Sequence, residues 1–489
     1  MLRMNSWKAM VVLSVFCLAT AGAARAQTLT TLADFNASNG STPESTLVQA
    51  TDGNFYGTAM NGGAYGAGTV FKVTPNGELT TLYSFCAQSG CPDGKIPNAG
   101  LMQASDSDLY GSTSMGGRKN NGTIFKITPE GALTTLHSFT GADGANPNAA
   151  LIEASEGTFY GTTSNGGANN ACPTGPGCGT IFEITAEGNF TTLHNFVGTD
   201  GRLVDAPLIQ ATDGNFYGTT AEGGGNGCSP YPGCGTVFKM NPAGSVTTLY
   251  AFHSADGWFP AGALVQATNG NFYSTTNWGG TFNLGTIFEL TPSGELTTLH
   301  SFDLTDGSMP GIGMIQATDG NLYGTTTSGG PTAVYGTFNG GYGTIFEVTP
   351  EGEFTNLLNF DDTDGSTPWG GLVQATDGNF YGTTISGGAG GGTVFSLYTG
   401  LAPFVRLTRA SGETGEAITI LGTDLTGTTK VTFNGKPAQF KVVSSTEIQA
   451  TVPAGVSTGK VEVITPQGAL SSNVPFRVEL RPKVRHGRV

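Results

Sequence analysis

Histidine suits proton transfer near neutral pH because its unperturbed pKa is about 6.5. Three of the five histidines, His137, His194 and His300, share one position of a recurring segment. Tyrosine holds the same position in two other copies, at Tyr83 and Tyr250. A position that accepts either residue does not supply a general base in every copy, so we predict that these side chains pack rather than catalyse.

Aspartates recur in two series, and both fall where turns are expected. One series lies within the copies, at Asp52, Asp106, Asp213, Asp319 and Asp377, with Glu156 and Asn269 in the other two. The second lies between the copies, at Asp93, Asp143, Asp200, Asp256, Asp306 and Asp364, with Asn39 in the first. Asp and Asn favour turns because their side chains bond nearby backbone groups. A ring of carboxylates that attracts Ca²⁺ is the alternative, but single aspartates at wide spacing make a poor calcium cage. We predict no metal and no cofactor.

Other carboxylates do not recur and could serve an enzyme. They include Glu44, Asp205, Glu222, Asp303 and Asp361. Hydrolysis of a glycosidic bond uses two carboxyl groups about 5 to 10 Å apart. If these side chains converge, the alternative interpretation is a carbohydrate-active enzyme with its site in an axial funnel. Otherwise we expect a protein without catalytic activity.

Large aromatic residues gather in the segments that vary between copies. These segments hold Trp258, Trp278 and Trp369, and the long insert of the sixth copy holds Tyr335 and Tyr342. Aromatic side chains on loops stack against sugars or serve as hot spots for proteins. They also cover apolar parts of the loops, and the sequence leaves both roles open. These five residues form the candidate ligand-binding set.

Six of the seven cysteines come as close neighbours, and the seventh, Cys17, lies in the N-terminal segment that we expect to be removed. The pairs are Cys86 with Cys91, Cys172 with Cys178, and Cys228 with Cys234. Their even number and local spacing, together with an N-terminal export signal, favour disulfides. A metal site is the alternative, but the pairs fall in three different copies and have no histidine at ligand spacing. We predict three disulfides, each within one loop.

The elements that carry these residues follow a phrase, Tyr-Gly-Thr-Thr or a close variant, that occurs seven times. Its tyrosines recur every 50 to 58 residues, which is long enough for one four-stranded unit. In the first copy, strand-forming runs cover residues 47–50, 54–59, 68–74 and 78–85, here called strands A to D. The A–B and C–D turns are short, whereas the B–C and D–A loops vary in length. Successive connections of an antiparallel sheet alternate between its two ends. The variable loops must therefore share one face, where binding usually resides.

The seventh copy has no D strand of its own. The segment from Thr28 to Phe35 matches a D strand such as Leu79 to Phe85. The first strand can therefore complete the last sheet and remove an exposed edge. We predict an all-β protein whose residues 27–400 form a seven-bladed β-propeller closed by the N-terminal strand.

The N-terminal segment, residues 1–26, has Arg3 and Lys8, then an apolar run over 9–21 and the small-residue site 24–26. This pattern is typical of a cleaved signal peptide. Its removal takes away three positive charges and changes the formal charge from -15 to -18, which argues against nucleic acid as a partner. No later stretch reaches the roughly 18 consecutive apolar residues of a membrane helix. We expect a secreted or extracytoplasmic monomer, at the cell surface or in the periplasm.

Residues 401–479 depart from the repeat and alternate short strands with Gly, Pro and Asn turns, as in a small β-sandwich. This segment resembles an IPT/TIG domain, an immunoglobulin-like module, at Gly415, Gly422, Val431 to Gly435, Val452-Pro453, Gly459 and Phe476. A basic tail over residues 480–489 follows it, with Arg481, Lys483, Arg485 and Arg488.

The repeats from Thr28 to Leu397 resemble the GloVer tandem-repeat (choice-of-anchor) family of exported bacterial proteins. The resemblance rests on the Phe-Tyr-Gly-Thr-Thr, Gly-Gly, Gly-Thr-Val-Phe-Lys and Thr-Thr-Leu pattern of each copy. It implies an extracytoplasmic repeat protein without a defined catalytic activity. We therefore expect a binding or scaffolding module that recognises a cell-surface glycan or protein through its variable loops.

Overall fold

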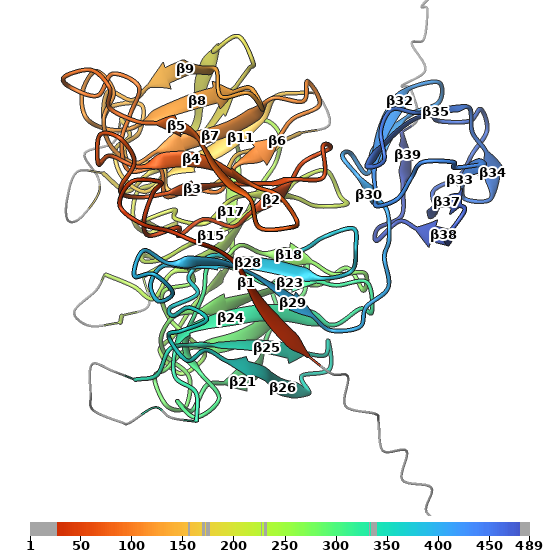
Figure 1. Cartoon of the computed structure of the whole chain (residues 1–489). Coiled ribbons are helices and arrows are strands. Elements are labelled where there is room, and N and C mark those ends of the chain that lie inside the picture. Colours follow the sequence, from red (N-terminus) through yellow and green to blue (C-terminus); the bar gives the residue numbers. More distant parts are fainter. Residues whose placement is uncertain are drawn as a thin grey trace, which may run out of the picture.

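The computed structural model describes residues 27–154, 157–168, 172, 177–225, 227–228, 232–331, 333 and 340–479. The predicted signal peptide, the basic tail and the candidate residue Tyr335 lie outside the described residues. Within the described residues all regular structure is β-strand. The repeats form seven sheets, and a separate group of strands follows at the C-terminus (Figure 1).

Five of the sheets, numbered 1 to 5 here, contain four consecutive antiparallel strands that correspond to A, B, C and D. Sheet 1 consists of β2 (Val48–Gln49), β3 (Phe55–Ala59), β4 (Thr69–Val73) and β5 (Leu79–Ser84). Sheet 2 consists of β6 (Met102–Gln103), β7 (Leu109–Thr113), β8 (Thr123–Ile127) and β9 (Leu133–Ser138). Sheet 3 consists of β10 (Ile152–Glu153), β11 (Phe159–Thr163), β12 (Thr180–Ile184) and β13 (Phe190–Asn195). Sheet 4 consists of β14 (Ile209–Gln210), β15 (Phe216–Thr220), β16 (Thr236–Met240) and β17 (Val246–Ala251). Sheet 5 consists of β18 (Val265–Gln266), β19 (Phe272–Thr276), β20 (Thr286–Leu290) and β21 (Leu296–Ser301).

The last two sheets depart from this plan. Sheet 6 has an additional strand and consists of β22 (Ser308–Pro310), β23 (Ile315–Gln316), β24 (Leu322–Ser328), β25 (Thr344–Val348) and β26 (Phe354–Asn359). Sheet 7 consists of β27 (Val373–Gln374), β28 (Phe380–Thr384), β29 (Thr393–Tyr398) and the N-terminal β1 (Thr28–Asp34). β1 runs antiparallel to β29, so the N-terminal strand supplies the missing D strand, as the sequence predicts.

Burial explains why the strands have these sequences. The B and C strands are rich in aromatic and β-branched residues, which fit a pleated sheet. Sheet 1 is typical, because every residue of β3 is buried and four of the five residues of β4 are buried. The D strands are only partly buried and have polar threonines at exposed positions, as in β5. D is therefore the solvent-facing edge of each sheet.

Hydrophobic clusters between the sheets join them in a cycle. One cluster joins sheets 1 and 2, and others join each later sheet to the next, up to sheets 6 and 7. A further cluster joins sheet 7 to sheet 1, with Tyr381 and Val394 from sheet 7 and Phe55 and Phe71 from sheet 1. Each sheet thus buries both faces against neighbours, and the last sheet packs on the first.

The tyrosine and the glycine of the Tyr-Gly-Thr-Thr phrase both serve the packing of side chains in the core. In sheet 4 the ring of Tyr217 lies on that of Phe272 in sheet 5, with their centroids 4.3 Å apart. A Cβ on Gly218 would lie 2.6 Å from Cζ of Phe238, closer than packed carbon atoms approach. The glycine therefore leaves room for the phenylalanine of strand C.

Hydrogen bonds repeat the same connection from sheet to sheet. The Thr219 hydroxyl donates to the Gly262 carbonyl of the next sheet at 3.3 Å. Between the last and first sheets, the Thr383 hydroxyl donates to the Ser45 carbonyl at 3.1 Å. The last residue of the A strand, glutamine in six sheets and Glu153 in sheet 3, adds a second connection, as where Gln49 Oε1 accepts from the backbone nitrogen of Thr376 at 3.1 Å. The contact between sheets 7 and 1 therefore has the same bonds as contacts between consecutive sheets.

The C-terminal strands form a two-sheet module. One sheet contains β30 (Arg406–Leu407), β32 (Ala417–Leu421), β36 (Glu447–Thr451) and β35 (Phe440–Val442). The other contains β34 (Lys436–Pro437), β33 (Lys430–Phe433), β37 (Val461–Thr465) and β38 (Gly468–Ser471). A parallel pair, β31 (Ser411–Glu413) and β39 (Arg477–Glu479), adjoins them. Residues of both sheets, including Ile420 and Val463, share one buried core, as in a β-sandwich.

The module lies against the end of the sheets that has the A–B turns (Figure 1). The Arg406 guanidinium donates to the Gln49 carbonyl, and the Thr446 hydroxyl donates to the Thr51 carbonyl at 2.7 Å. Burial lowers the pKa of Arg406 to about 10. At the A–B turn of sheet 4, Arg477 donates to the Thr212 carbonyl at 2.6 Å. The module therefore reaches from sheet 1 to sheet 4.

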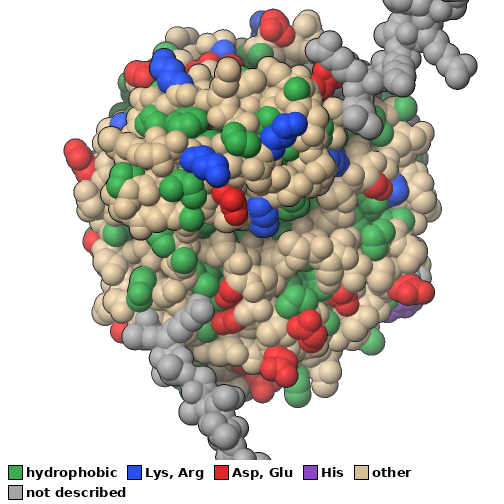
Figure 2. Space-filling model, turned by 90° about the vertical axis from the view of Figure 1, so that its right-hand side faces the viewer, with side chains coloured by type: hydrophobic (Ala, Val, Ile, Leu, Met, Phe, Trp, Pro, Cys, Tyr) green, Lys and Arg blue, Asp and Glu red, His purple; other side chains and the backbone are tan. Residues whose placement is uncertain are grey.

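A cavity of about 820 Å³ lies between the module and the sheets. Its lining includes Glu153, Gln210 and Gln266 from A strands and Arg409 and Arg477 from the module. Figure 2 views this side of the molecule; its upper part, where the module lies, has Lys and Arg interspersed with Asp and Glu, whereas its lower part shows mainly Asp and Glu. The sequence accounts for this contrast, because residues 27–400 carry seven Lys and Arg against 30 Asp and Glu.

Candidate functional site

The B–C and D–A loops meet at one end of the sheets, which we call the loop face; the opposite end, with the A–B and C–D turns, is the turn face. In every repeat a D–A loop residue pairs by antiparallel backbone bridging with a B–C loop residue. The pairs are Ser41 with Asn61, Lys95 with Met115, Ala145 with Asn165, Arg202 with Glu222, Trp258 with Trp278, Ser308 with Ser328, and Ser366 with Ser386. These cross-loop pairs differ in chemistry while sharing one backbone geometry.

Two of the predicted tryptophans form one cross-loop pair. The backbone nitrogen of Trp258 donates to the Trp278 carbonyl at 2.9 Å, and the reverse bond measures 3.1 Å. Residues directly opposite in an antiparallel pair bring their side chains together. Their ring centroids are accordingly 6.4 Å apart, with the planes inclined by 51°. Both side chains are half-buried rather than exposed.

The Trp258 side chain is supported by the neighbouring repeat. It packs against a cluster that contains Cys228 and Cys234, which close a loop of sheet 4. The backbone nitrogen of Phe259 also donates to the Cys234 carbonyl at 3.1 Å. The disulfide therefore holds the surface on which the tryptophan rests.

The other candidate aromatics lie elsewhere on the loop face. Trp369 follows the proline of the D–A loop that leads to sheet 7 and is half-buried. Tyr342 is 42% exposed, and its carbonyl accepts from the backbone nitrogen of Thr367, two residues before Trp369. The structure thus brings Trp258 and Trp278 into ring contact, and it places Tyr342 beside the loop of Trp369.

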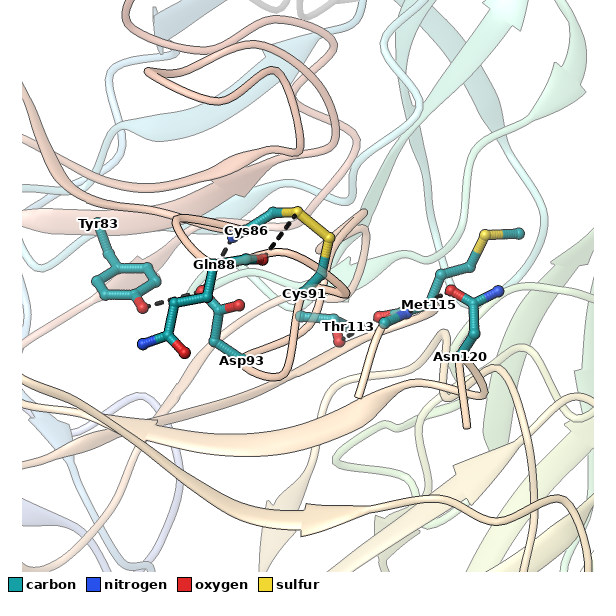
Figure 3. Close-up of a disulfide and its surroundings, with 9 residues drawn as sticks. Tyr83, Cys86, Gln88, Cys91, Asp93, Thr113, Met115 and Asn120 are labelled. Carbon is teal, nitrogen blue, oxygen red and sulfur yellow. Dashed lines mark hydrogen bonds between the residues drawn. A yellow bond between two sulfur atoms is a disulfide. The ribbon is translucent and has the colours of Figure 1, made fainter. Parts of the chain in front are cut away.

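All three predicted disulfides are present, and all lie in loops of the loop face. They join Cys86 to Cys91, Cys172 to Cys178, and Cys228 to Cys234. Figure 3 shows the first of these beside Asp93, whose carboxylate accepts from the Tyr83 hydroxyl and the Cys86 backbone nitrogen, each at 2.9 Å. The disulfide and the aspartate thus hold the same D–A loop.

The recurring histidines and the Asp-Gly aspartates bond to one another, a contact that the sequence analysis missed. His137, His194 and His300 contact the aspartate six residues later, with nitrogen-to-oxygen distances of 3.0, 2.9 and 2.7 Å. Tyr250 and Asp256 form the same contact at 2.5 Å. The fixed six-residue spacing is the signal that could have revealed it. Burial lowers the pKa of His137, an effect that Asp143 opposes.

The turn-face aspartates accept hydrogen bonds from the tyrosine of the Tyr-Gly-Thr-Thr phrase. Asp52 accepts from the Tyr56 hydroxyl at 2.8 Å, and Asp213 accepts from Tyr217 at 2.9 Å. This carboxylate therefore satisfies a hydroxyl at the end of a buried side chain, in addition to forming the turn. Among the described residues, no three His, Cys, Asp or Glu side chains gather where they could hold a metal ion.

Polar side chains that do not recur occupy one D–A loop position in sheets 1 to 4, directly after a proline in sheets 1 to 3 and after Val204 in sheet 4. The position holds Glu44, Asn98, Asn148 and Asp205 there, and Ala261, Gly311 and Trp369 in sheets 5 to 7. Asn98 donates to Oδ1 of Asn148 at 3.3 Å, and Asn148 donates to Oδ1 of Asp205 at 3.1 Å. These bonds run from one repeat to the next, so the equivalent positions of sheets 2 to 4 adjoin one another. Burial raises the pKa of Glu44.

Asn98, Asn148 and Asp205 thus form a row, here called the polar row. A charged pair adjoins this row. Nε of Arg202 lies 3.3 Å from Oε2 of Glu222, and both side chains are largely buried. Burial raises the pKa of Glu222, an effect that Arg202 opposes and Asp205 reinforces. Of the five non-recurring carboxylates, Asp205 and Glu222 are thus near neighbours. Asp303 and Asp361 instead accept hydrogen bonds within their own loops.

Comparisons with known proteins follow the same division of the chain. The family model described as Gloeobacter/Verrucomicrobia repeat matches residues 15–174 and 155–338. The chain belongs to this repeat family. The IPT/TIG domain model matches residues 404–478, so the C-terminal module of this family member is an IPT/TIG domain. A comparison with curated proteins finds no match.

Solved structures resemble this repeat protein in fold. A fungal alcohol oxidase of the AA5 family in complex with copper matches with a TM-score of 0.52 and 13% identity, over 94% of this chain and 100% of that one. The PQQ-bound form of an aldose sugar dehydrogenase from Streptomyces coelicolor matches with a TM-score of 0.40 and 15% identity, over 61% of this chain and 92% of that one. At 13% identity, the match to the alcohol oxidase shows the fold and not the function. In the described part of the chain, no helix is long and apolar enough to cross a membrane.

Proposed function

We propose that this repeat-family chain is an exported binding module that recognises a glycan or protein through its loop face. Residues 27–400 form a seven-bladed β-propeller, residues 401–479 the IPT/TIG domain, and the protein is a monomer. The cycle of interface clusters and the β1–β29 pairing support the closed propeller. The three disulfides support export, because disulfides persist in oxidising compartments.

The Trp258–Trp278 pair is the observation that carries the binding role. Two indoles held by facing loops give a rigid aromatic surface, and tryptophans are enriched among binding hot spots. The same position holds small or polar pairs in four other repeats, so the propeller itself does not require aromatic residues there. The indoles are therefore available for recognition.

The experiment compares glycan and cell-wall-fragment binding by the mature protein and two variants. Trp258→Ala with Trp278→Ala should weaken binding about thirtyfold or more, the loss typical of hot-spot residues. Tyr65→Ala is the matched control, because Tyr65 is a 56% exposed aromatic residue on the loop face of sheet 1. Unchanged binding by the double variant would refute the proposal.

A carbohydrate-active enzyme is the second candidate, and one observation favours it. Asp205 and Glu222 are neighbouring carboxylates, and the raised pKa of Glu222 suits a general acid. The ion pair with Arg202 opposes that role. Hydrolysis of chromogenic glycosides by the mature protein, abolished by Glu222→Gln, would support the enzyme, and absence of hydrolysis would rule out this activity.

A further inference from the structure

The polar row on the loop face departs from the symmetry of the repeat. Asn148 and Asp205 stand where sheets 5 and 6 have Ala261 and Gly311. Ser164, which follows the phrase in sheet 3, stands where sheet 4 has Ala221. Since small residues at these positions still give folded sheets, the propeller does not need the polar side chains. Their grouping in consecutive repeats calls for another explanation.

The hydrogen bonds within the row leave acceptors available. Asn148 donates to Oγ of Ser164 at 2.8 Å, and both Asn148 and Ser164 donate to Oδ1 of Asp205. In the described chain Oδ2 of Asp205 has no hydrogen bond to another residue. The second carboxylate oxygen is thus held in a fixed direction and can accept a bond from a ligand.

Two amide oxygens of loop-face side chains are further hydrogen-bond acceptors without a donor. Oδ1 of Asn98 and Oδ1 of Asn277 are buried and have no hydrogen-bond partner in the described structure. Asn277 is only 2% exposed, stands at the position of Ser164 in sheet 5, and directly precedes Trp278. A buried acceptor without a donor is costly, so a water or another bound molecule that brings donors would stabilise this region.

The aromatic pair lies next to the row. Trp258 packs against the cluster that contains Cys228 and Cys234 of the sheet 4 B–C loop, and Glu222 is at the start of the same loop. The cross-loop position thus holds Arg202 and Glu222 in sheet 4, and Trp258 and Trp278 in sheet 5. Oriented polar groups beside an aromatic surface fit a ligand with hydroxyl groups on its edge and an apolar face.

Charge limits the ligand further. The row and the adjoining charged pair together hold two carboxylates, those of Asp205 and Glu222, against one guanidinium, that of Arg202. The repeats around it carry 30 Asp and Glu against seven Lys and Arg. An anionic ligand would be repelled, and it would lack donors for the open acceptors. Neutral sugars and amino sugars have neither disadvantage.

Building on the proposed binding function, we infer that the loop face binds a neutral or amino-sugar saccharide, with Asp205 as the acceptor for its hydroxyl groups and the Trp258–Trp278 pair as its stacking surface. Asn148 and Ser164 are positioning residues, because their bonds fix the direction of the Asp205 carboxylate.

The test measures binding to the mature protein by calorimetry with three probes: a neutral hexose oligomer, an N-acetylhexosamine oligomer and an oligouronate. The wild type should bind one of the first two at least tenfold more tightly than the oligouronate. Asp205→Asn removes the charged acceptor with little change in shape, and it should weaken that binding about tenfold or more. Ser164→Ala frees the carboxylate and should have a smaller effect in the same direction.

Asp303→Asn is the matched control, because Asp303 is a loop-face carboxylate that bonds within its own loop. It should change affinity less than twofold, and melting temperatures should show that all variants fold. Equal binding of the oligouronate, or unchanged binding by Asp205→Asn, would overturn the saccharide inference. If the tryptophan double variant still lost binding in that case, the proposed binding function would stand. Binding that withstands both the tryptophan and the Asp205 variants would overturn both proposals.

Discussion

The turn face and the loop face are opposite ends of the same seven sheets, yet they use their residues differently. On the turn face the Asp–Tyr bond and the glutamine contact recur from repeat to repeat, and the C-terminal module covers part of the surface. On the loop face the backbone bridge recurs while its side chains change from Ser and Asn to Trp with Trp. Recurrence therefore marks what the fold requires, and variation on a fixed backbone marks what remains available for recognition.

The largest effect should come from a recurring core residue. Phe125 is fully buried in the cluster that joins sheets 1 and 2. Phe125→Ala should lower the free energy of unfolding by about 3 to 5 kcal/mol, since it removes packed area and leaves a cavity. Tyr342→Ala on the loop face should stay within about 0.5 kcal/mol. Urea denaturation of both variants measures the difference, and similar losses would contradict the distinction between scaffold and variable positions.

The disulfides allow a sharper test within the loop face. Cys228→Ser with Cys234→Ser should lower the free energy of unfolding by about 2 kcal/mol, as expected for a closed loop of about six residues. It should also weaken ligand binding, because Trp258 packs on that loop.

The Cys86 and Cys91 pair provides the control for this prediction. Replacing both with serine should cost a similar free energy and leave binding unchanged, because their loop leads to sheet 2 rather than sheet 5. Denaturation and calorimetry on the same samples separate the two effects. Equal loss of affinity in both variants would mean that loop order in general, and not support of Trp258, controls binding.

Alkaline titration compares a tyrosine from each face. Burial and the bond to Asp93 raise the pKa of Tyr83 on the loop side to about 12. Burial and the bond to Glu289 raise that of Tyr273 at the turn face, also to about 12. The unfolded chain ionises tyrosine near pH 10, so the stabilisation is complete below pH 10 and is lost between about pH 10 and 12. Tyr83→Phe and Tyr273→Phe should each flatten this fall in stability, as measured by urea denaturation at increasing pH.

The smallest effect should come from His137. Burial holds its pKa below the ordinary value, so the unfolded chain takes up this proton first as the pH falls. Its contribution to stability is complete above about pH 6.5 and declines below it. The histidine ring resonances in an NMR titration should report a midpoint below that of an unfolded reference peptide. A midpoint at or above the reference would show that Asp143 outweighs burial.

Much of the fold could be predicted from the sequence because each repeat carries its own local signals. The strand-forming runs match β2 to β5, and the Thr28 to Phe35 match anticipated the pairing of β1 with β29. Cysteine spacing gave the three disulfides because each closes a loop of a few residues.

Contacts between repeats were less predictable, because they depend on how distant segments pack. The sequence placed Trp258 and Trp278 on one face but gave no sign that backbone bridging makes them a pair. The Asn148–Asp205 bond spans 57 residues and is likewise invisible to local pattern. Two hints were available: the six-residue spacing of His and Asp, and the run of polar residues at one position of the first four D–A loops.

The pairing of β1 with β29 also sets the order in which the chain can finish folding. Thr28 is opposite Tyr398, so the first strand to be synthesised waits for a partner that is made near the end of the repeats. Individual sheets can form early from neighbouring segments, but this last contact must close a loop of more than three hundred residues, which is slow. A chain cut short before β29 leaves the edge of β1 open and prone to pair with another copy. The N-terminal strand therefore finds its partner only in chains that extend through β29.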